Sequence, residues 1–512
     1  MQHGEFANPN AGAGSYVLSS WLFLRVLGLI YLAAFISLGT QVKGLVGNRG
    51  ILPAHLFLKS KLSWGPTRWL QIPTLCWWNA GDGFLQFLCW GGAALALPLI
   101  VGVAPIPVLI ALWVFYLSLF SVCRIFMGYQ WDVLLLEAGF LAVFMAPSDL
   151  RPEFPTMAPS RIILWLFWWL VFRLMFSSGF VKLRSGDRTW RNLTALCYHY
   201  QTQPLPTGTA WYMSQLPDWF HKLSVVVMFA IELVAPVFVF LPPPFSYISG
   251  AAFLFLMLLI ANTGNYCFFN LLGIALSILL FDDACWLVVF RKLSPDIQFH
   301  ADALAGTGWP IWATIPVALI LTLLSVVVMG RLLRFEFRWP KPLEHCIEWL
   351  EPFRLVNSYG LFAVMTTERL EIIVEGSDDG LAWREYEFKW KPGDVRRAPR
   401  FVAPHQPRLD WQMWFAALSS YPRTPWFHRF LLRLLGNSPD VLALLGKNPF
   451  PNKPPRFIRA AVYEYRFTDF ARNRATGAWW RRERRGLYSP VLSLRDPSSK
   501  EPLLDDEDSL YD

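Results

Sequence analysis

The segment "WLFLRVLGLIYLAAFISLGT" (residues 21–40) decides the fold class of this chain. It contains one charged residue, Arg25. About 20 predominantly apolar residues in a helix are enough to cross the hydrocarbon core of a bilayer. The segment is too long for the core of a signal peptide, and no convincing small-residue cleavage site follows it. We therefore predict a membrane span that the mature protein retains.

Similar apolar segments recur through the first 330 residues. Hydrophobic residues make up 54% of the 512-residue chain and charged residues 16%, well below the roughly 25% charged residues of an average soluble domain. The chain is therefore predicted to be a polytopic α-helical membrane bundle of about nine spans, with the lipid bilayer as a partner. The further expected spans are 84–104, 105–126, 132–147, 161–180, 223–242, 245–263, 266–290 and 310–330.

Changes in composition divide the chain into five predicted regions. A polar segment (1–20) precedes the multi-span domain (21–330), which includes two long extramembrane loops, 41–83 and 181–222. The remaining regions are a basic linker (331–354), a mostly β soluble domain (355–490) and an acidic, disordered tail (491–512).

The soluble domain is assigned from two-residue periodicity. "ERLEIIVEGSDDGLAWREYEFKWKPGD" (368–394) contains two strand-like runs joined by a Ser-Asp-Asp-Gly turn. Tyr386, Phe388 and Trp390 would share one face of a strand, and Tyr463 and Tyr465 alternate with charged residues in the same way. We expect a sandwich-like fold, interrupted by helical patches such as 425–446.

The net charge of +9 comes mainly from the loops and the C-terminal third of the chain. In a membrane protein such charge reports orientation and headgroup contact, so no nucleic-acid partner is predicted. With nine spans, both long loops share one side of the membrane with the C-terminal domain. The positive-inside rule assigns that side to the cytoplasm.

The motifs of common enzyme classes do not occur in the sequence. It lacks a G-x-S-x-G elbow, a P-loop, a G-x-G-x-x-G and an H-E-x-x-H motif, and its seven cysteines form no C-x-x-C pair. Cys197 and His199 are two residues apart, which directs them away from each other on a strand or a helix. Two local ligands are also too few for a metal site. We predict no catalytic residue, no cofactor and no metal.

Five charged residues lie within expected spans, where an unpaired charge is expensive. The prediction is that opposite charges on different helices pair and fix the packing of the bundle. A path for protons or ions is the alternative. These residues are Arg25, Asp132, Glu137, Arg173 and Glu232.

Two regions combine Trp, Tyr, His and Arg, the residue types that supply many interface hot spots. They are interpreted as candidate surfaces for a protein client. The alternative is anchoring at headgroup depth for the loop, and a solvated basic face for the domain. The candidates are Arg188, Trp190, Arg191, Tyr198, His199 and Tyr200 in the loop, and His405, Arg408, Trp411, Trp479 and Trp480 in the domain.

Asn192 begins an Asn-Leu-Thr sequon. A glycan would attach there only if the loop faces a secretory lumen. The sequon is therefore also a test of membrane topology.

Several long motifs resemble the lipase maturation factor family, and the resemblance extends from about residue 20 to residue 490. They include "TQVKGLVGNRGILP" (40–53), "YQWDVLLLEAGFLAVFMAP" (129–147), "RLMFSSGFVKLRSGDRTWRNLTALCYHYQTQPLP" (173–206), "NTGNYCFFNLL" (262–272), "VEGSDDGLAWREYEFKWKPGD" (374–394) and "PHQPRLDWQMWFAAL" (404–418).

The resemblance implies a multi-pass membrane protein of the endoplasmic reticulum in animals. Such a protein assists the folding and assembly of secreted lipases without being a lipase. The family's C-terminal part is usually placed in the lumen, opposite to the positive-inside assignment. This chain has an acidic tail and no retrieval signal of the Lys-Asp-Glu-Leu type, and in a prokaryote its membrane would be the cytoplasmic one.

Two functions follow from the sequence as hypotheses. The first is a non-enzymatic maturation factor that holds a folding client at the membrane. The alternative is an integral-membrane enzyme that modifies lipids or proteins at an unidentified site.

Overall fold

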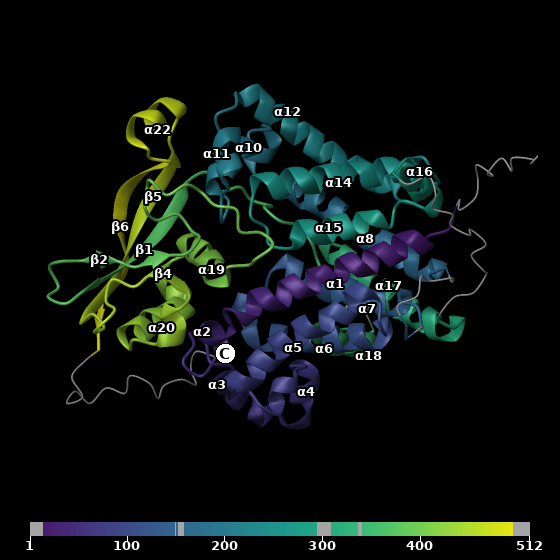
Figure 1. The fold of residues 1–512 in the computed structure, drawn as a ribbon, viewed down its shortest axis with the longest axis horizontal. Coiled ribbons are helices and arrows are strands. Elements are labelled where there is room, and N and C mark those ends of the chain that lie inside the picture. The colour runs from purple at the N-terminus through teal and green to yellow at the C-terminus, as the bar shows by residue number, and fades with distance from the viewer. Residues whose placement is uncertain (1–13, 149, 152–157, 294–308, 336–339, 495–512) are drawn as a thin grey trace, which may run out of the picture.

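The computed structural model of the chain describes residues 14–148, 150–151, 158–293, 309–335 and 340–494. Most of the predicted N-terminal segment (1–20) and acidic tail (491–512), and part of the predicted linker (331–354), lie outside these residues. A bundle of helices forms one part of the molecule, and a sheet with short helices covers one end of it (Figure 1).

Seven described helical segments are long and apolar enough to cross a membrane. Each has at least 19 residues, or about 28 Å at 1.5 Å per residue, close to the hydrocarbon thickness of roughly 30 Å. They are α1 (Val17–Gly39), α5 (Asp82–Val101), α6 with the following turn (Pro105–Phe126), α8 (Arg161–Arg184), α12 with α13 (Asp218–Phe238), α14 (Phe245–Thr263) and α17 (Ile311–Leu333).

The other two expected spans form shorter helices. Segment 132–147 becomes α7 (Gln130–Met145), with 16 residues. Segment 266–290 forms α15 (Phe269–Ile278) and α16 (Asp283–Leu293), which are bent by 103° at the break between them. Counting this bent pair as one span gives eight. The expected number of about nine therefore exceeds the number of segments that are long enough by themselves.

Both short helices nevertheless lead from the sheet end of the bundle to its far end. α7 starts beside the C-terminal domain, where Asp132 contacts Arg408, and ends where Phe144 packs on Trp309. α15 follows Cys267, whose Sγ donates to the Pro404 carbonyl, and leads to residues that contact the start of α1. Nearly every side chain of α7 is buried by other helices. A helix enclosed by protein does not have to match the thickness of the bilayer.

A local irregularity pairs the charge within the span Asp218–Phe238. Residues Ala230–Val234 form a π-helical turn, a feature that often re-aims side chains at functional sites. Glu232 in this turn lies 2.6 Å from Lys182 Nζ of α8. Gly179 of α8 permits the close approach, because a Cβ there would lie 2.8 Å from the Leu233 side chain.

The loop 41–83 forms short helices beside the C-terminal domain. They are α2 (Val42–Val46), α3 (Ala54–Ser60), the 3-10 turns Leu62–Thr67 and Leu75–Trp77, and α4 (Arg68–Gln71). Ser438 Oγ donates to the Arg49 carbonyl at 2.7 Å, and Arg433 Nε donates to the Gly50 carbonyl at 2.8 Å. This loop and the C-terminal domain thus lie at the same end of the bundle.

The loop 181–222 contains α9 (Arg188–Arg191), α10 (Ala195–Thr202) and α11 (Gly208–Met213). Figure 1 shows these helices at the same end of the bundle, on the side opposite α3 and α4. After α17 the chain forms α18 (Lys341–Leu350) and a 3-10 turn (Glu351–Phe353), and then enters the C-terminal domain.

The C-terminal domain contains two antiparallel sheets. The larger has the order β2-β1-β5-β6, from strands Arg384–Glu385, Arg369–Ser377, Phe457–Phe467 and Trp480–Ser493. The predicted Ser-Asp-Asp-Gly turn joins β1 to β2, and Glu375 pairs with Glu385. The smaller sheet pairs β3 (Glu387–Phe388) with β4 (Leu445–Lys447). The antiparallel strands agree with the prediction from alternation.

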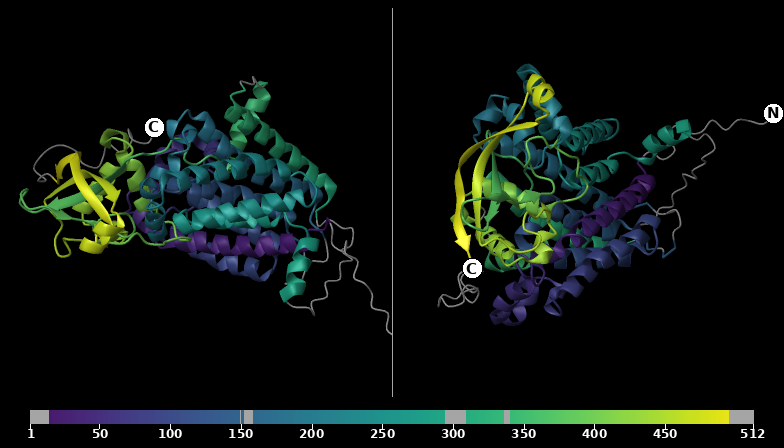
Figure 2. Two further views of the ribbon diagram at one scale, coloured as in Figure 1. Left: turned by 90° about the horizontal axis from the view of Figure 1, so that it is seen from above. Right: turned by 60° about the vertical axis from the view of Figure 1, so that its left-hand side comes forward.

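Helices cover the inner face of the larger sheet, where a sandwich would place a second large sheet. α19 (Arg408–Ala417) and α20 (Pro425–Leu435) lie between the sheet and the bundle, as Figures 1 and 2 show. The shorter helices α21 (Pro439–Leu442) and α22 (Phe470–Thr476) complete the domain. Buried apolar residues of the bundle and of the domain form one continuous core.

Arg408, the first residue of α19, enters the bundle and pairs with Asp132 of α7. Its Nη1 and Nη2 atoms donate to the two carboxylate oxygens at 2.9 and 2.8 Å. Tyr116 of α6 donates to the same carboxylate at 2.6 Å. Both charged side chains are 0% exposed. The pair therefore fixes the domain to the bundle away from solvent.

A second buried pair joins α7 to α8 and to the chain that enters the C-terminal domain. Glu137 accepts a hydrogen bond from the Arg173 guanidinium. Its other oxygen accepts from the Asn357 backbone N–H at 2.9 Å and from the Tyr359 hydroxyl at 2.7 Å. Among the five intramembrane charges, Arg25 differs: its Nη1 donates to the Leu99 carbonyl at 3.3 Å.

Arg408→Met is expected to destabilise the protein by about 3–5 kcal/mol, because it leaves Asp132 buried without a counter-ion. Titration of the detergent-solubilised protein with a denaturing detergent measures the loss. Arg384→Met is the matched control. Arg384 pairs with Asp378 with side chains 51% and 56% exposed, and such pairs contribute about 0–1 kcal/mol. Equal losses for the two variants would contradict the anchoring role.

Candidate functional site

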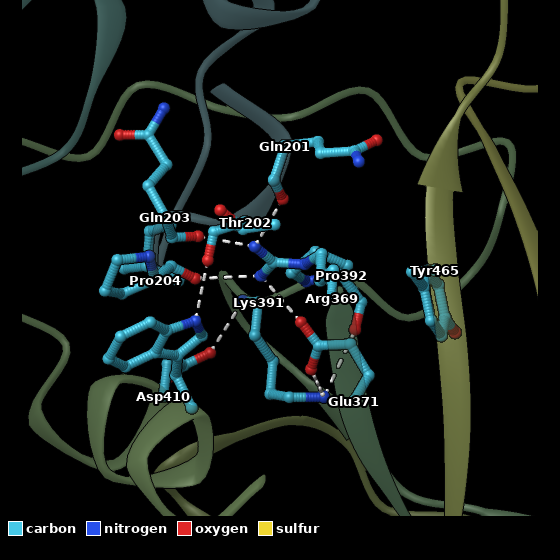
Figure 3. Close-up of polar contacts among 12 residues, drawn as sticks. Gln201, Thr202, Gln203, Pro204, Arg369, Glu371, Lys391, Pro392, Asp410 and Tyr465 are labelled. Carbon is cyan, nitrogen blue, oxygen red and sulfur yellow. Dashed lines mark hydrogen bonds and ion pairs between the residues drawn. The ribbon is translucent and has the colours of Figure 1, made fainter. Parts of the chain in front are cut away.

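The C-terminal domain holds the end of α10 through backbone carbonyl groups. Arg369, the first residue of β1, donates from Nη1 to the carbonyls of Gln201, at 2.8 Å, and Gln203. Its Nη2 donates to the Pro204 carbonyl at 2.9 Å (Figure 3). The last carbonyls of a helix lack intrahelical partners. One guanidinium group thus satisfies the chain end of α10 and joins the loop 181–222 to the sheet.

A buried carboxylate lies between Arg369 and a second cation. Glu371 is 2.6 Å from Arg369 Nη2 and 2.8 Å from Lys391 Nζ, and all three side chains are at most 2% exposed. Burial lowers the pKa of Arg369, and the negative charge of Glu371 opposes that shift. Two cations share one carboxylate here, and carbonyl oxygens around them supply the remaining negative potential.

α19 completes this junction from the other side. Asp410 Oδ1 accepts from the backbone N–H groups of Trp390 and Lys391, both at 2.9 Å. Burial raises the pKa of Asp410, and these hydrogen bonds act in the opposite direction. Trp414 donates from Nε1 to the Thr202 carbonyl at 2.8 Å. Figure 3 shows these groups converging on residues 201–204.

Most of the predicted client-binding residues lie inside the protein or at its internal junctions. Trp190 donates to the Phe362 carbonyl, Trp411 packs on Trp131, and Trp480 packs on Phe467. The buried residues are Trp190, Tyr200, Arg408, Trp411 and Trp480; the half-buried ones are Tyr198, His199, His405 and Trp479; the exposed ones are Arg188 and Arg191.

Cys197 and His199 do not form a catalytic pair. The Cys197 Sγ atom lies 3.9 Å from Asp218 Oδ1, whereas His199 Nε2 lies 3.1 Å from the Tyr266 hydroxyl. Burial and the Asp218 carboxylate raise the pKa of Cys197, the opposite of what an activated thiolate nucleophile needs. Burial and Lys182 lower the pKa of His199 to about 4, so its imidazole is neutral near pH 7.

A cluster of aromatic rings is exposed where the loop 181–222 meets the domain. Trp211 of α11 is buried and lies 5.0 Å from the rings of Tyr212, Phe470 and Trp479. Tyr212 is 55% and Phe470 54% exposed. We call Tyr212, Phe470 and Trp479 the aromatic ridge. Among its members, sequence reasoning selected only Trp479. The adjacent pair Trp211-Tyr212 was the available signal, but nothing local places α22 beside α11.

No group of three or more His, Cys, Asp or Glu residues in the described part of the chain could hold a metal ion. The buried charges at the junction instead pair with one another or bind backbone groups. Their arrangement can fix one element against another, and the ridge next to them offers apolar surface to a partner.

Comparison with known proteins places both halves of this arrangement in one family. Residues 18–288 match the lipase maturation factor transmembrane domain, and residues 355–490 match the lipase maturation factor C-terminal domain. The chain belongs to the lipase maturation factor family.

Full-length relatives in this family are similar over most of the chain. Lipase maturation factor 2 of Gallus gallus is 37% identical, covering 93% of this chain and 82% of the relative. Lipase maturation factor 1 is 35% identical in Bos taurus and 34% in Homo sapiens, with 94% of this chain covered and 90% and 89% of the relatives. No solved structure matches the chain.

The two regions that define the lipase maturation factor family meet at the junction described above. The first region begins in α1 and ends in α16, so it contains α10, whose carbonyl groups bind Arg369. The second begins just after α18, at Leu355, and ends in β6. Contacts between two family-defining regions therefore position the aromatic ridge.

The His199→Gln variant is expected to lose less stability than the wild type between about pH 6.5 and pH 4. His199 has a folded-state pKa of about 4, below the ordinary value of about 6.5. The unfolded chain therefore binds a proton first as the pH falls, which destabilises the fold. The midpoint of unfolding against pH measures this effect. His405, also at about 4, supplies the remaining dependence.

His345→Gln is the matched control, since His345 is an exposed histidine of α18. Its profile should follow that of the wild type. An unchanged profile for His199→Gln would show that His199 is protonated in the folded protein.

Proposed function

We propose that this chain is a non-enzymatic maturation factor that assists the folding and assembly of secreted lipases at the endoplasmic reticulum membrane. Its membership in the lipase maturation factor family supports this function. The aromatic ridge is the observation that carries the proposed mechanism. It is an exposed apolar surface beside the membrane-embedded bundle, held in place by buried ion pairs.

The ridge has the properties of a transient binding surface. An immature client exposes apolar surface that its native fold later buries, and aromatic rings supply large contact area with little loss of conformational entropy. Exposed Arg472 and Arg474 of α22 lie beside Phe470 in the sequence. Such a polar rim around aromatic anchors is the usual anatomy of a protein interface.

The double variant Tyr212→Ala/Phe470→Ala is expected to reduce the yield of active lipase severalfold, because it removes the exposed rings from the ridge. Secreted lipase activity per unit of lipase protein measures the effect in cells that lack an endogenous maturation factor. The abundance of the variant should stay at the wild-type level, since both side chains are more than half exposed.

Trp69→Ala/Trp78→Ala is the matched control. These two exposed rings lie 6.0 Å apart in the loop 41–83, on the other side of the bundle end. Lipase activation should be unaffected by this variant. Equal losses in the two double variants would exclude a specific role of the ridge.

A glycan at Asn192 tests the side of the membrane that the ridge must occupy. A lumenal client can contact the ridge only if the loop 181–222 faces the lumen. Asn192 is exposed at the end of α9, so oligosaccharyltransferase could reach it. Expression in animal cells should give a band that shifts on glycosidase treatment and is lost in Asn192→Gln.

Absence of the glycan, together with labelling of Cys197 only from the cytoplasm, would contradict direct contact with a lumenal client. The enzymatic alternative has its own signature in the lipase assay. A single replacement of Cys197, His199, Glu137 or Glu232 would abolish lipase activation at normal abundance of a folded protein.

A further inference from the structure

A cavity of about 560 Å³ lies where the bundle, α18 and the entry to the C-terminal domain meet. One wall is apolar and comes from the second half of α17, including Leu324, Val327 and Val328. The opposite wall comes from the start of α7 and the segment after α18. In Figure 2 (left) the green helices α17 and α18 lie at the margin of the bundle. The cavity is separate from the aromatic ridge.

Two guanidinium groups line the cavity. Arg354 Nε is buried and has no hydrogen-bond partner within the described ranges, and its guanidinium lies 5.5 Å from the Phe120 ring. Arg331, in the last turn of α17, also lines the cavity and makes no ion pair with a described residue. Buried Gln130 Oε1, on the opposite wall, is likewise unpartnered among these residues. Such groups are costly unless a ligand or water satisfies them.

The surroundings of the cavity are those of a membrane interface. Outward-facing side chains of α17 are strongly exposed and apolar, as Leu319 at 66% shows, so this helix faces lipid. Arg331 lies at its end, where basic side chains reach headgroups. α18 has a strongly one-sided distribution of apolar residues, with Ile347 buried against the cavity and Trp349 exposed, as in helices that lie in the interface plane.

We propose that this cavity binds the headgroup of a glycerophospholipid. Arg331 and Arg354 hold the phosphodiester, Leu324, Val327 and Val328 contact the glycerol and the upper acyl chains, and the carboxylate of Glu351 accepts from a headgroup amine. The two arginines and one glutamate give the lining one net positive charge, which complements a single phosphodiester. Guanidinium groups are well suited to bind phosphate oxygens with two parallel hydrogen bonds.

Native mass spectrometry of the full-length protein in mild detergent tests this site, with phosphatidylethanolamine as the probe. Arg331→Gln and Arg354→Gln should each weaken retention of the lipid about tenfold, since each removes a charge-assisted contact. Diacylglycerol, which has the same chains without the phosphate, should bind at least tenfold more weakly. Inorganic phosphate at millimolar concentration should leave retention of the lipid unchanged.

Arg334→Gln is the matched control, because Arg334 is an exposed arginine three residues after Arg331 that does not line the cavity. It should retain lipid like the wild type. Val328→Trp should lose the lipid by filling the apolar wall, with both cavity arginines intact and a wild-type melting temperature. Wild-type retention by Arg354→Gln and Val328→Trp, equal binding of diacylglycerol, or displacement by inorganic phosphate would overturn the proposal.

Discussion

The burial of opposite charges between the bundle and the C-terminal domain is the constraint on which the rest of this structure depends. Arg408 begins α19, and its guanidinium lies inside the bundle against Asp132. Neither charge could remain there alone, because transfer of an unpaired charge from water into protein or lipid is costly. The domain therefore cannot separate from the bundle without exposing two costly groups, and the two parts share one core.

The same principle organises the junction with the loop 181–222. Arg369 binds carbonyl oxygens at the end of α10, and Glu371 compensates its charge. The loop consequently has a fixed position against the sheet, and α11 brings Trp211 against Phe470 of α22. The exposed rings of the aromatic ridge are thus a product of buried polar contacts. A surface positioned in this way suits a protein that must bind its partners in one orientation.

Buried charges also change the interpretation of the residue types that look functional in the sequence. Trp, Tyr and Arg are typical of interface hot spots, and they are also typical of the internal junctions of a large protein. Arg408 and Trp411 satisfy the first description in sequence and the second in structure. Tyr212 and Phe470 carry weaker local signals, yet they are more than half exposed. Composition cannot distinguish the two cases, because exposure depends on what packs against the residue.

The sequence by itself determined the membrane bundle, the antiparallel strands of the C-terminal domain and the family, because each rests on a local period or a contiguous motif. An apolar segment such as 21–40 must leave water, and alternation such as that of Tyr386 and Phe388 favours a strand. Only the tertiary structure decided that Asp132 pairs with Arg408 and that α11 meets α22. These residues are hundreds of positions apart in the chain, and their partners are selected by the packing of the whole fold.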